Sequence, residues 1–224
     1  MDFNNKKLII FDLDGTLIDS VPDLALAINL TLKSLNLKEF SEDTIRAWVG
    51  NGALALVQRA LSSSVEIDKN LNIGFVNKAL KIFLEYYKNN LTTSTILYPH
   101  VKQILKYLKE KEYVLSIVTN KPFKFVSPIL KNLNIEQYFT YCVGADSLDE
   151  KKPSAKPLIH VCEKLNISIE NSIMIGDSKN DILSASNAKM DSIAVSYGYN
   201  YDEDITKYNP NIIFDEFSLL KEVF

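Results

Sequence analysis

A short apolar segment that ends abruptly in acidic residues constrains the fold of this chain more than any other feature. Leu8–Phe11 contains no polar side chain and is followed directly by the sequence Asp-Leu-Asp-Gly-Thr. Such a run is typical of a strand that is buried on both faces of a parallel sheet. Side chains two residues apart in an extended segment point the same way, so Asp12 and Asp14 are expected to face one spot at the end of the strand. In open α/β sheets, ligands bind at that edge.

The two carboxylates have two interpretations. Because they repel each other when held close together, they favour a site with a cation or a shared proton between them. Gly15 would allow the backbone to turn sharply, and the Thr16 hydroxyl would brace the turn. Alternatively, the strand is followed by an acidic turn in which aspartate side chains cap the backbone.

The chain after this strand has helical rather than strand periodicity over about 70 residues. This is too long for an ordinary crossover and indicates a helical domain inserted after the first strand. Ser20 and Asp23 have the spacing of a capping box, with Pro22 tolerated in the first turn. We expect residues 19–96 to form the insert and residues 1–18 and 97–224 to form the core. The predicted helices of the insert are Val21–Leu35, Glu42–Trp48, Ala53–Leu61 and Ile73–Tyr87.

Beyond the insert, apolar runs alternate with segments of helical periodicity. Alternation of this kind predicts a doubly wound parallel sheet with helices on both faces, that is, a Rossmann-like α/β core. The predicted strands are Tyr113–Val118, Tyr138–Val143, Ser172–Ile175, Ile193–Val195 and Ile212–Phe214.

Composition and charge exclude several classes of protein. A chain of 224 residues, 46% hydrophobic and 24% charged, suits one soluble α/β domain or a core with one insert. The net charge of −3 predicts no basic surface for nucleic acid or for an anionic membrane. The N-terminal apolar run is too short for a signal peptide or a membrane span, so we expect a cytoplasmic protein. Cys142 and Cys162 lack Cys-x-x-Cys spacing, which favours reduced thiols.

Two later strands also end at polar residues, which would meet Asp12 and Asp14 at the same edge of the sheet. Thr119 and Asn120 offer a hydroxyl and backbone N–H groups of the kind that hold phosphoryl oxygens, or they form a simple strand-ending turn. Asp177 would add a third carboxylate, a set that suits Mg²⁺ because this ion prefers oxygen ligands.

Asp181 follows Asp177 by four residues and is expected on the same helix face. Ser178 and Asp181 also fit a capping box, and capping is compatible with metal binding at the same place. Lys151 and Lys152 precede another predicted helix. A lysine pair is more often solvated surface than part of a site, so a role for either lysine depends on the surrounding motifs.

Those motifs occur in a fixed order over Asp12–Asp181. They read Asp-x-Asp-Gly-Thr, Thr-Asn-Lys, Lys-Pro and Gly-Asp-Ser-x-x-Asp. In this order and spacing they resemble the four motifs of the haloacid dehalogenase superfamily of phosphotransferases. The helical insert resembles the C1 cap of that superfamily.

The resemblance implies a phosphatase that works through an aspartyl-phosphate. Asp12 would be the nucleophile, and Asp14 would act as general acid and then as general base. The phosphoryl oxygens would be neutralised by Thr119, the backbone of Asn120 and Lys152.

The resemblance also implies that the enzyme depends on Mg²⁺ and on closure of the cap. Asp12, the backbone carbonyl of Asp14 and Asp177 would hold the ion, while Asp181 would support these ligands from behind. The cap would close over the substrate and exclude water until the leaving group departs. The expected partner is a small phosphorylated metabolite, and the expected assembly is a monomer or a weak dimer.

A narrower resemblance is to the bacterial members of the family that hydrolyse 2-phosphoglycolate to glycolate and phosphate. It rests on Trp48–Gly52 with Leu56–Leu61, on Thr119–Pro122 and on Ser196–Asn200. Ala155 departs from the usual Lys-Pro-x-Pro-x-Pro-Leu pattern by replacing the middle proline, with little expected effect on chemistry. The alternatives are another C1-capped phosphatase or a β-phosphoglucomutase that acts on sugar phosphates. A phospho-accepting receiver domain is an alternative outside the enzymes, but Asp14 and the insert argue against it.

Substrate choice is expected to depend on the insert, because the core handles only the phosphoryl group. The Val49–Gly52 segment breaks two predicted helices, and the helix that follows would present its N-terminus to a small carboxylate. Asn51 and Gly52 are therefore candidate substrate-binding residues. Arg59 would either pair with the substrate or brace the insert through a structural ion pair.

Overall fold

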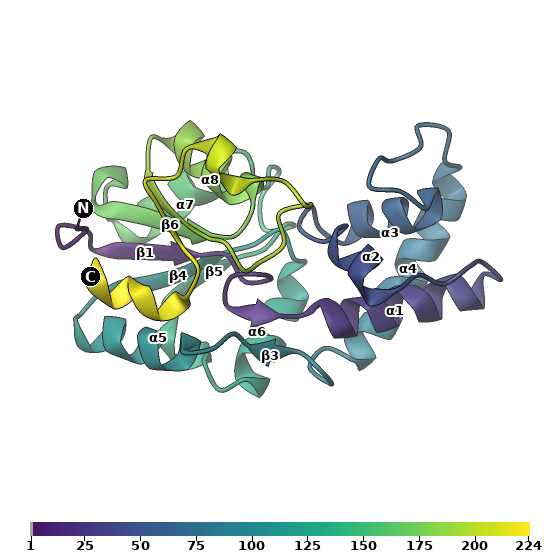
Figure 1. Ribbon diagram of the computed structural model, residues 1–224, viewed down its shortest axis with the longest axis horizontal. Coiled ribbons are helices and arrows are strands. Elements are labelled where there is room, and N and C mark those ends of the chain that lie inside the picture. The colour runs from purple at the N-terminus through teal and green to yellow at the C-terminus, as the bar shows by residue number, and fades with distance from the viewer. Residues whose placement is uncertain (1) are drawn as a thin grey trace.

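The structure, a computed structural model, describes residues 2–224 and is built around a six-stranded sheet with β1 in its interior. The strand order is β5-β4-β1-β6-β7-β8, and every neighbouring pair is parallel (Figure 1). Parallel neighbours need crossover connections, which the helices between the strands supply. The strands are β1 (Leu8–Phe11), β4 (Val114–Val118), β5 (Tyr141–Val143), β6 (Ser172–Gly176), β7 (Asp191–Val195) and β8 (Ile212–Phe214).

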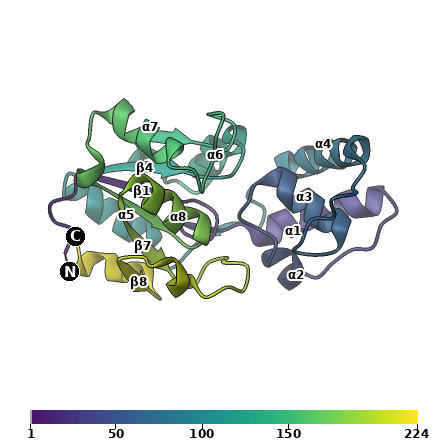
Figure 2. The same ribbon diagram turned by 90° about the horizontal axis from the view of Figure 1, so that it is seen from above.

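Helices cover both faces of this sheet, as Figure 2 shows. Ile9 and Phe11 of β1 pack with α5 (Val101–Glu110) and α6 (Phe123–Asn132) on one face. Leu8 and Ile10 pack with α7 (Lys156–Leu165) and α8 (Lys179–Ala188) on the other. Burial on both faces explains why β1 is continuously apolar instead of alternating. The predicted doubly wound α/β core is confirmed.

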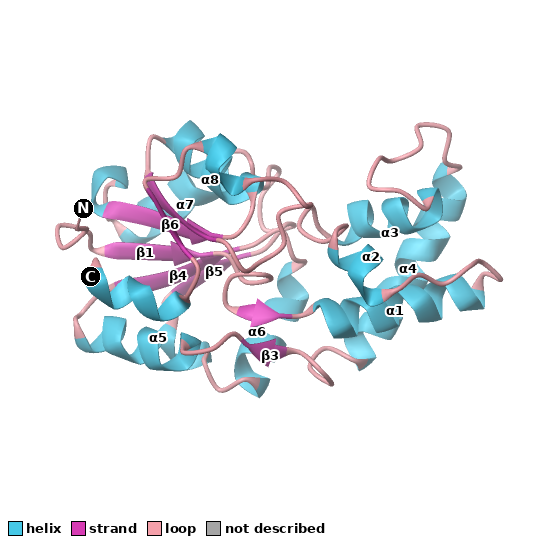
Figure 3. Cartoon of the chain, in the orientation of Figure 1, coloured by secondary structure: helices cyan, strands magenta, loops and turns pink. Residues whose placement is uncertain are grey.

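Four further helices lie together beyond the carboxyl ends of the strands and are called the cap below (Figures 1 and 2). A short antiparallel ribbon of β2 (Ile18–Asp19) and β3 (Ile96–Leu97) lies where the chain enters and leaves the cap (Figure 3). The ribbon coincides with the boundaries expected for the insert, and the division into domains at residues 18/19 and 96/97 stays a prediction. The cap helices are α1 (Val21–Ser34), α2 (Glu42–Arg46), α3 (Ala53–Ser62) and α4 (Ile73–Asn89).

The predicted capping box at the start of α1 is wrong. Ser20 is the N-cap residue, but its hydroxyl donates to the Asp14 carboxylate at 2.5 Å instead of capping the helix. The Asp23 carboxylate accepts hydrogen bonds from the backbone N–H groups of Ser94 and Thr95, where the chain leaves the cap. Both side chains thus have tertiary partners, which compete with the local capping arrangement.

The predicted strand Tyr138–Val143 is also only partly correct. Its first residue belongs to a short 3₁₀ helix, Glu136–Tyr138, and the strand β5 begins at Tyr141. Among residues 2–224, the structure contains no helix that is both long enough and apolar enough to span a membrane.

Candidate active site

The carboxyl end of β1 places Asp12 and Asp14 at the edge of the sheet that faces the cap. The backbone N–H of Asp12 donates to the carbonyl of Ile175 in β6 at 2.9 Å, so the sheet itself fixes this residue. Gly15 follows with a φ of +91°, a conformation that other residues rarely adopt. A β-carbon at Gly15 would overlap the carboxylate of Asp177. The glycine therefore allows the segments that carry Asp12 and Asp177 to meet.

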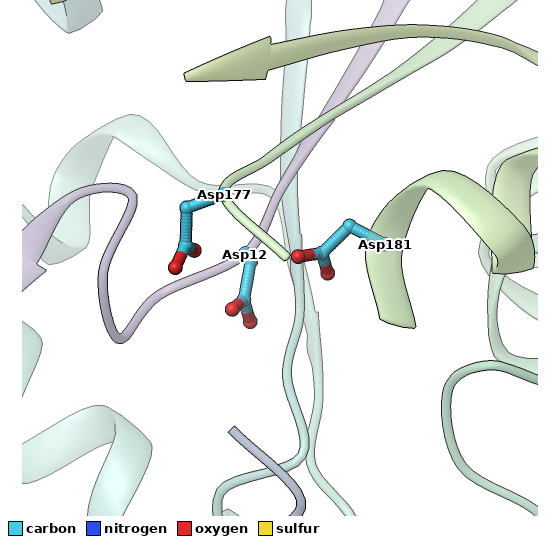
Figure 4. A group of neighbouring side chains, drawn as sticks. All are labelled: Asp12, Asp177 and Asp181. Atoms are coloured by element: carbon cyan, nitrogen blue, oxygen red, sulfur yellow. The ribbon is translucent and has the colours of Figure 1, made fainter. Parts of the chain in front are cut away.

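Asp12, Asp177 and Asp181 form a cluster of three carboxylates (Figure 4). One oxygen from each lies within 4.8 Å of the others. The two oxygens of Asp177 accept hydrogen bonds from the Thr16 hydroxyl and the Tyr199 backbone N–H, each at 2.7 Å. Asp177 lies between the end of β6 and the start of α8, so the expectation that it shares a helix face with Asp181 is wrong. The turn into α8 brings the two residues together instead.

Lys152 lies buried between two members of this cluster. Its Nζ is 2.8 Å from Oδ1 of Asp12 and 2.6 Å from Oδ1 of Asp181, and its side chain is 1% exposed. The other oxygen of Asp181 accepts from the backbone N–H and the hydroxyl of Ser178, which completes the predicted capping box. Both oxygens of Asp181 thus accept hydrogen bonds. Lys151, which precedes Lys152 in the sequence, is exposed. Of the lysine pair, only Lys152 reaches the cluster.

The negative charge of the three carboxylates exceeds the single positive charge of Lys152. Burial raises the pKa of Asp12 to about 7, although Lys152 opposes the shift. Burial and the neighbouring Asp181 and Asp12 raise the pKa of Asp177 well above its ordinary value. Oδ1 of Asp12 is buried and, apart from its ion pair with Lys152, has no hydrogen-bond partner among residues 2–224. A hard divalent cation would offset this excess negative charge, so the residues present fit Mg²⁺.

Thr119 and Asn120 follow β4 and are both buried beside the aspartates. The Thr119 oxygen accepts from the Lys121 backbone N–H at 3.2 Å. The Asn120 amide donates to the carbonyls of Lys152 and Gly50, at 3.0 and 3.1 Å. Asn120 therefore joins three parts of the site: the end of β4, the loop that carries Lys152 and the cap. The expectation that the strand ends meet at one edge is confirmed.

The Val49–Gly52 loop of the cap lies directly against the core. A β-carbon at Gly50 would overlap the Tyr201 hydroxyl, and one at Gly52 would overlap the Asn120 carbonyl. Both glycines thus permit close contact between the cap and the core. Backbone carbonyls of this loop accept hydrogen bonds from the core side chains of Asn120, Lys151 and Asn180 at 3.1, 2.8 and 3.3 Å.

Arg59 braces the cap. Its guanidinium donates to the carbonyls of Trp48 and Val65 and to the side-chain oxygen of Asn51, at 2.6, 2.9 and 2.8 Å. It also lies 5.1 Å from the centre of the Tyr201 ring. Of the expected substrate-binding residues of the cap, Gly52 lines the cavity described next, but Asn51 and Arg59 do not. The position of Arg59 favours the bracing alternative, with oxygen acceptors in place of the expected ion pair.

A cavity of about 40 Å³ lies between the aspartates and the cap. Asp12, Asp14, Thr119 and Asn120 line its core side, and apolar residues of α1, α3 and α4 line its cap side. Two further lining residues, Lys121 and Tyr87, are absent from the set of expected site residues. Lys121 belongs to the Thr-Asn-Lys motif and directly follows two expected site residues, which was a usable signal. Tyr87 lies on the apolar face of α4, and the sequence periodicity predicts for such a residue only a place in the hydrophobic core.

Comparisons with known proteins agree with this geometry. Residues 9–195 match the sequence model of a family described as haloacid dehalogenase-like hydrolase. A protein of Colwellia psychrerythraea named phosphoglycolate phosphatase is 49% identical over 220 residues, which cover 98% of this chain and 97% of that protein. A protein of the same name from Psychrobacter arcticus is 48% identical, covering 96% and 94%. The crystal structure of a predicted phosphoglycolate phosphatase from Haemophilus somnus superimposes with a TM-score of 0.92 at 40% identity, covering 98% of each chain. The chain therefore belongs to the haloacid dehalogenase-like hydrolase family.

Proposed function

We propose that this hydrolase removes the phosphoryl group from 2-phosphoglycolate through a covalent intermediate on Asp12. One observation carries the proposal: Asp12 and Asp14 both line a small cavity under the cap. Asp12 is paired with Lys152, whereas Asp14 is paired with Lys121. Two carboxylates with different partners at one cavity suit a nucleophile and a separate proton carrier.

In this mechanism, a carboxylate oxygen of Asp12 attacks phosphorus, and the bond from phosphorus to the ester oxygen breaks. Asp14 gives a proton to the departing oxygen. A water molecule then attacks the phosphoryl group on Asp12, and Asp14 takes a proton from that water, which releases phosphate and restores both carboxyl groups. Lys152, Thr119 and the backbone N–H of Asn120 would stabilise the charge on the phosphoryl oxygens during both steps.

The same proposal assigns Mg²⁺ to the carboxylate cluster. Asp12, Asp177 and the backbone carbonyl of Asp14 would hold the ion, and when bound it would neutralise charge on the phosphoryl group. Asp181 would hold Lys152 and the start of α8 in place, since both of its oxygens already accept hydrogen bonds. Thr16 and Tyr199 would orient Asp177 in the same way.

The choice of substrate is supported by the relatives and by the cavity. Relatives that are 49% and 48% identical over nearly the whole chain are named phosphoglycolate phosphatase. A cavity of about 40 Å³ has room for a few water-sized groups, each of which needs about 10–15 Å³. A two-carbon leaving group suits that space better than a hexose does. Membership of a hydrolase family also argues against the receiver-domain alternative.

A panel of phosphate esters tests this assignment. With released phosphate as the readout, kcat/KM is expected to be highest for 2-phosphoglycolate and lower for ethyl phosphate, glucose 6-phosphate and β-glucose 1-phosphate. A higher value for either hexose phosphate would overturn the proposed substrate. Conversion of β-glucose 1-phosphate to an isomer without net phosphate release would identify a mutase.

Removal of divalent metal is expected to abolish hydrolysis. Excess EDTA should lower phosphate release to the background rate, and Mg²⁺ added beyond the chelator should restore it, because the carboxylate cluster needs a cation to accept an anionic substrate. Ca²⁺ is the control, since it binds similar ligands with longer bonds and looser geometry and should not restore the full rate. Undiminished hydrolysis in EDTA would rule out the metal assignment.

A further inference from the structure

One buried polar group in the cavity has no role in the mechanism above. Tyr87 of α4 lines the cavity from the cap side and is 1% exposed. Its ring is held by aromatic neighbours, stacked on Phe83 at 5.7 Å and edge-on to Phe125 at 5.2 Å. Its hydroxyl makes no hydrogen bond of ordinary geometry within residues 2–224, and the polar side chain next to it is Lys121. Buried hydroxyls are almost always paired, so one without a regular hydrogen bond, on a residue that lines a cavity, points to a ligand.

A lysine that is paired with Asp14 lies beside this hydroxyl. Nζ of Lys121 lies 4.7 Å from the centre of the Tyr87 ring and 2.8 and 3.1 Å from the two oxygens of Asp14. The Lys121 side chain is 3% exposed, and it is the one cationic side chain among the residues that line the cavity within the described chain. The lysine and the hydroxyl together can receive a small anion at the side of the cavity next to Asp14.

We propose that Lys121 and Tyr87 form the subsite that binds the carboxylate of the leaving group. The proposal rests on the proposed function and identifies the residues that read the substrate. In 2-phosphoglycolate a single methylene separates the ester oxygen from the carboxylate. An ester oxygen that receives its proton from Asp14 therefore places the carboxylate beside the lysine that holds Asp14.

The cap wall of the cavity offers this anion one other group of donors, the backbone N–H groups at the N-terminus of α3, where Gly52 and Ala53 line the cavity and no side chain caps the helix. The neighbouring lining residues of the cap are apolar, among them Leu24, Leu56 and Phe83. Burial raises the pKa of Tyr87 to about 12, so the hydroxyl stays protonated at neutral pH and can donate to a carboxylate. A substrate without the carboxylate would leave this hydroxyl unpaired. A site of this kind discriminates strongly against such analogues, because its own polar groups then lose their partners.

The subsite also links recognition to cap closure. Tyr87 belongs to the cap and Lys121 to the core, so the two groups bind one anion only when the cap lies against the core. In this proposal Lys121 and Tyr87, and not the expected Asn51 and Arg59, recognise the substrate. Asn51 and Arg59 hydrogen-bond to each other and do not line the cavity.

The test is Tyr87→Phe, which removes only the hydroxyl. The expected result is a loss of roughly 10–100-fold in kcat/KM for 2-phosphoglycolate, the usual effect of one hydrogen bond to a charged group. The value for ethyl phosphate, in which a methyl group replaces the carboxylate, should change by less than about threefold. Inhibition by glycolate, which carries the carboxylate without the phosphate, should weaken in parallel.

Tyr86→Phe is the matched control, because it removes a hydroxyl from the adjacent residue of α4 and should leave both substrates unaffected. Equal losses on both substrates in Tyr87→Phe would show that the hydroxyl only supports the structure, and would overturn the subsite. An unchanged preference for 2-phosphoglycolate in Tyr87→Phe would overturn it as well. Neither result would affect the proposed function, which fails only if the wild-type protein itself does not prefer 2-phosphoglycolate.

Discussion

Replacing Asp12 with asparagine is expected to lower phosphate release by at least about 10³-fold, because a neutral amide is a poor nucleophile. The loss should lie in the upper part of the range that a defect in proton transfer alone gives in most enzymes, about 10²–10⁴-fold, or beyond it, because a metal ligand is lost as well. The measurement is steady-state phosphate release from 2-phosphoglycolate. Asp215→Asn, at an exposed aspartate after β8, is the control and should keep the full rate.

The fold of the Asp12→Asn variant should survive. Because burial raises the pKa of Asp12 from 3.8 to about 7, the folded state resists ionisation of this group. The unfolded chain ionises first as the pH rises, so Asp12 weakens the metal-free fold increasingly between about pH 4 and pH 7. A neutral asparagine avoids this penalty, and thermal unfolding in EDTA at pH 8 should show an equal or higher midpoint. A variant that keeps more than about a thousandth of the wild-type rate would exclude Asp12 as the nucleophile.

The core of the fold could be predicted because its signals are local. The apolar run of β1 and the polar residues at the ends of β4 and β6 define both the sheet and the edge where the site lies. The ribbon of β2 and β3 could not be predicted, since two-residue strands are too short to show periodicity. Ser20 and Asp23 misled for a related reason: their spacing fits a local cap, but their partners are distant in sequence.

The residues of the site also fall into those that local motifs predict and those whose role depends on tertiary contacts. Motifs predict Asp12, Asp14, Asp177 and Lys152 as site residues, and the structure places these four side chains at one edge of the sheet. The roles of Arg59 and Tyr87 depend instead on which way a cap helix faces the core. A tyrosine on the apolar face of a helix reads as core packing, and only the unpaired hydroxyl in the folded structure distinguishes it. Arg59 reads equally well as a ligand or a brace until its three oxygen acceptors are known.

Replacing Lys152 with methionine should reduce both activity and stability, because the lysine is buried between Asp12 and Asp181. Loss of a buried charged group that stabilises the reacting oxygens typically lowers kcat by about 10²–10³-fold. Removing one partner of a buried ion pair typically lowers the free energy of unfolding by about 3–5 kcal/mol, since the remaining charges are left uncompensated. Released phosphate and denaturant unfolding in EDTA measure the two effects separately. Lys164→Met, at an exposed position of α7, should change neither.

The loss of stability should also depend on pH, which distinguishes lost charge pairing from lost packing. Lys152 lowers the pKa of Asp12, which is nevertheless about 7, so removing the lysine moves that pKa higher still. Below about pH 6, Asp12 is protonated in both folded proteins, so the destabilisation relative to wild type should be constant there. It should grow as the pH rises from about 7 to 9, where Asp12 ionises in the folded wild type but stays protonated in the folded variant. Methionine fills a similar volume, so a packing defect would give a loss that is independent of pH. A difference that stays constant from pH 7 to pH 9 would therefore show that Lys152 does not balance the charge of Asp12.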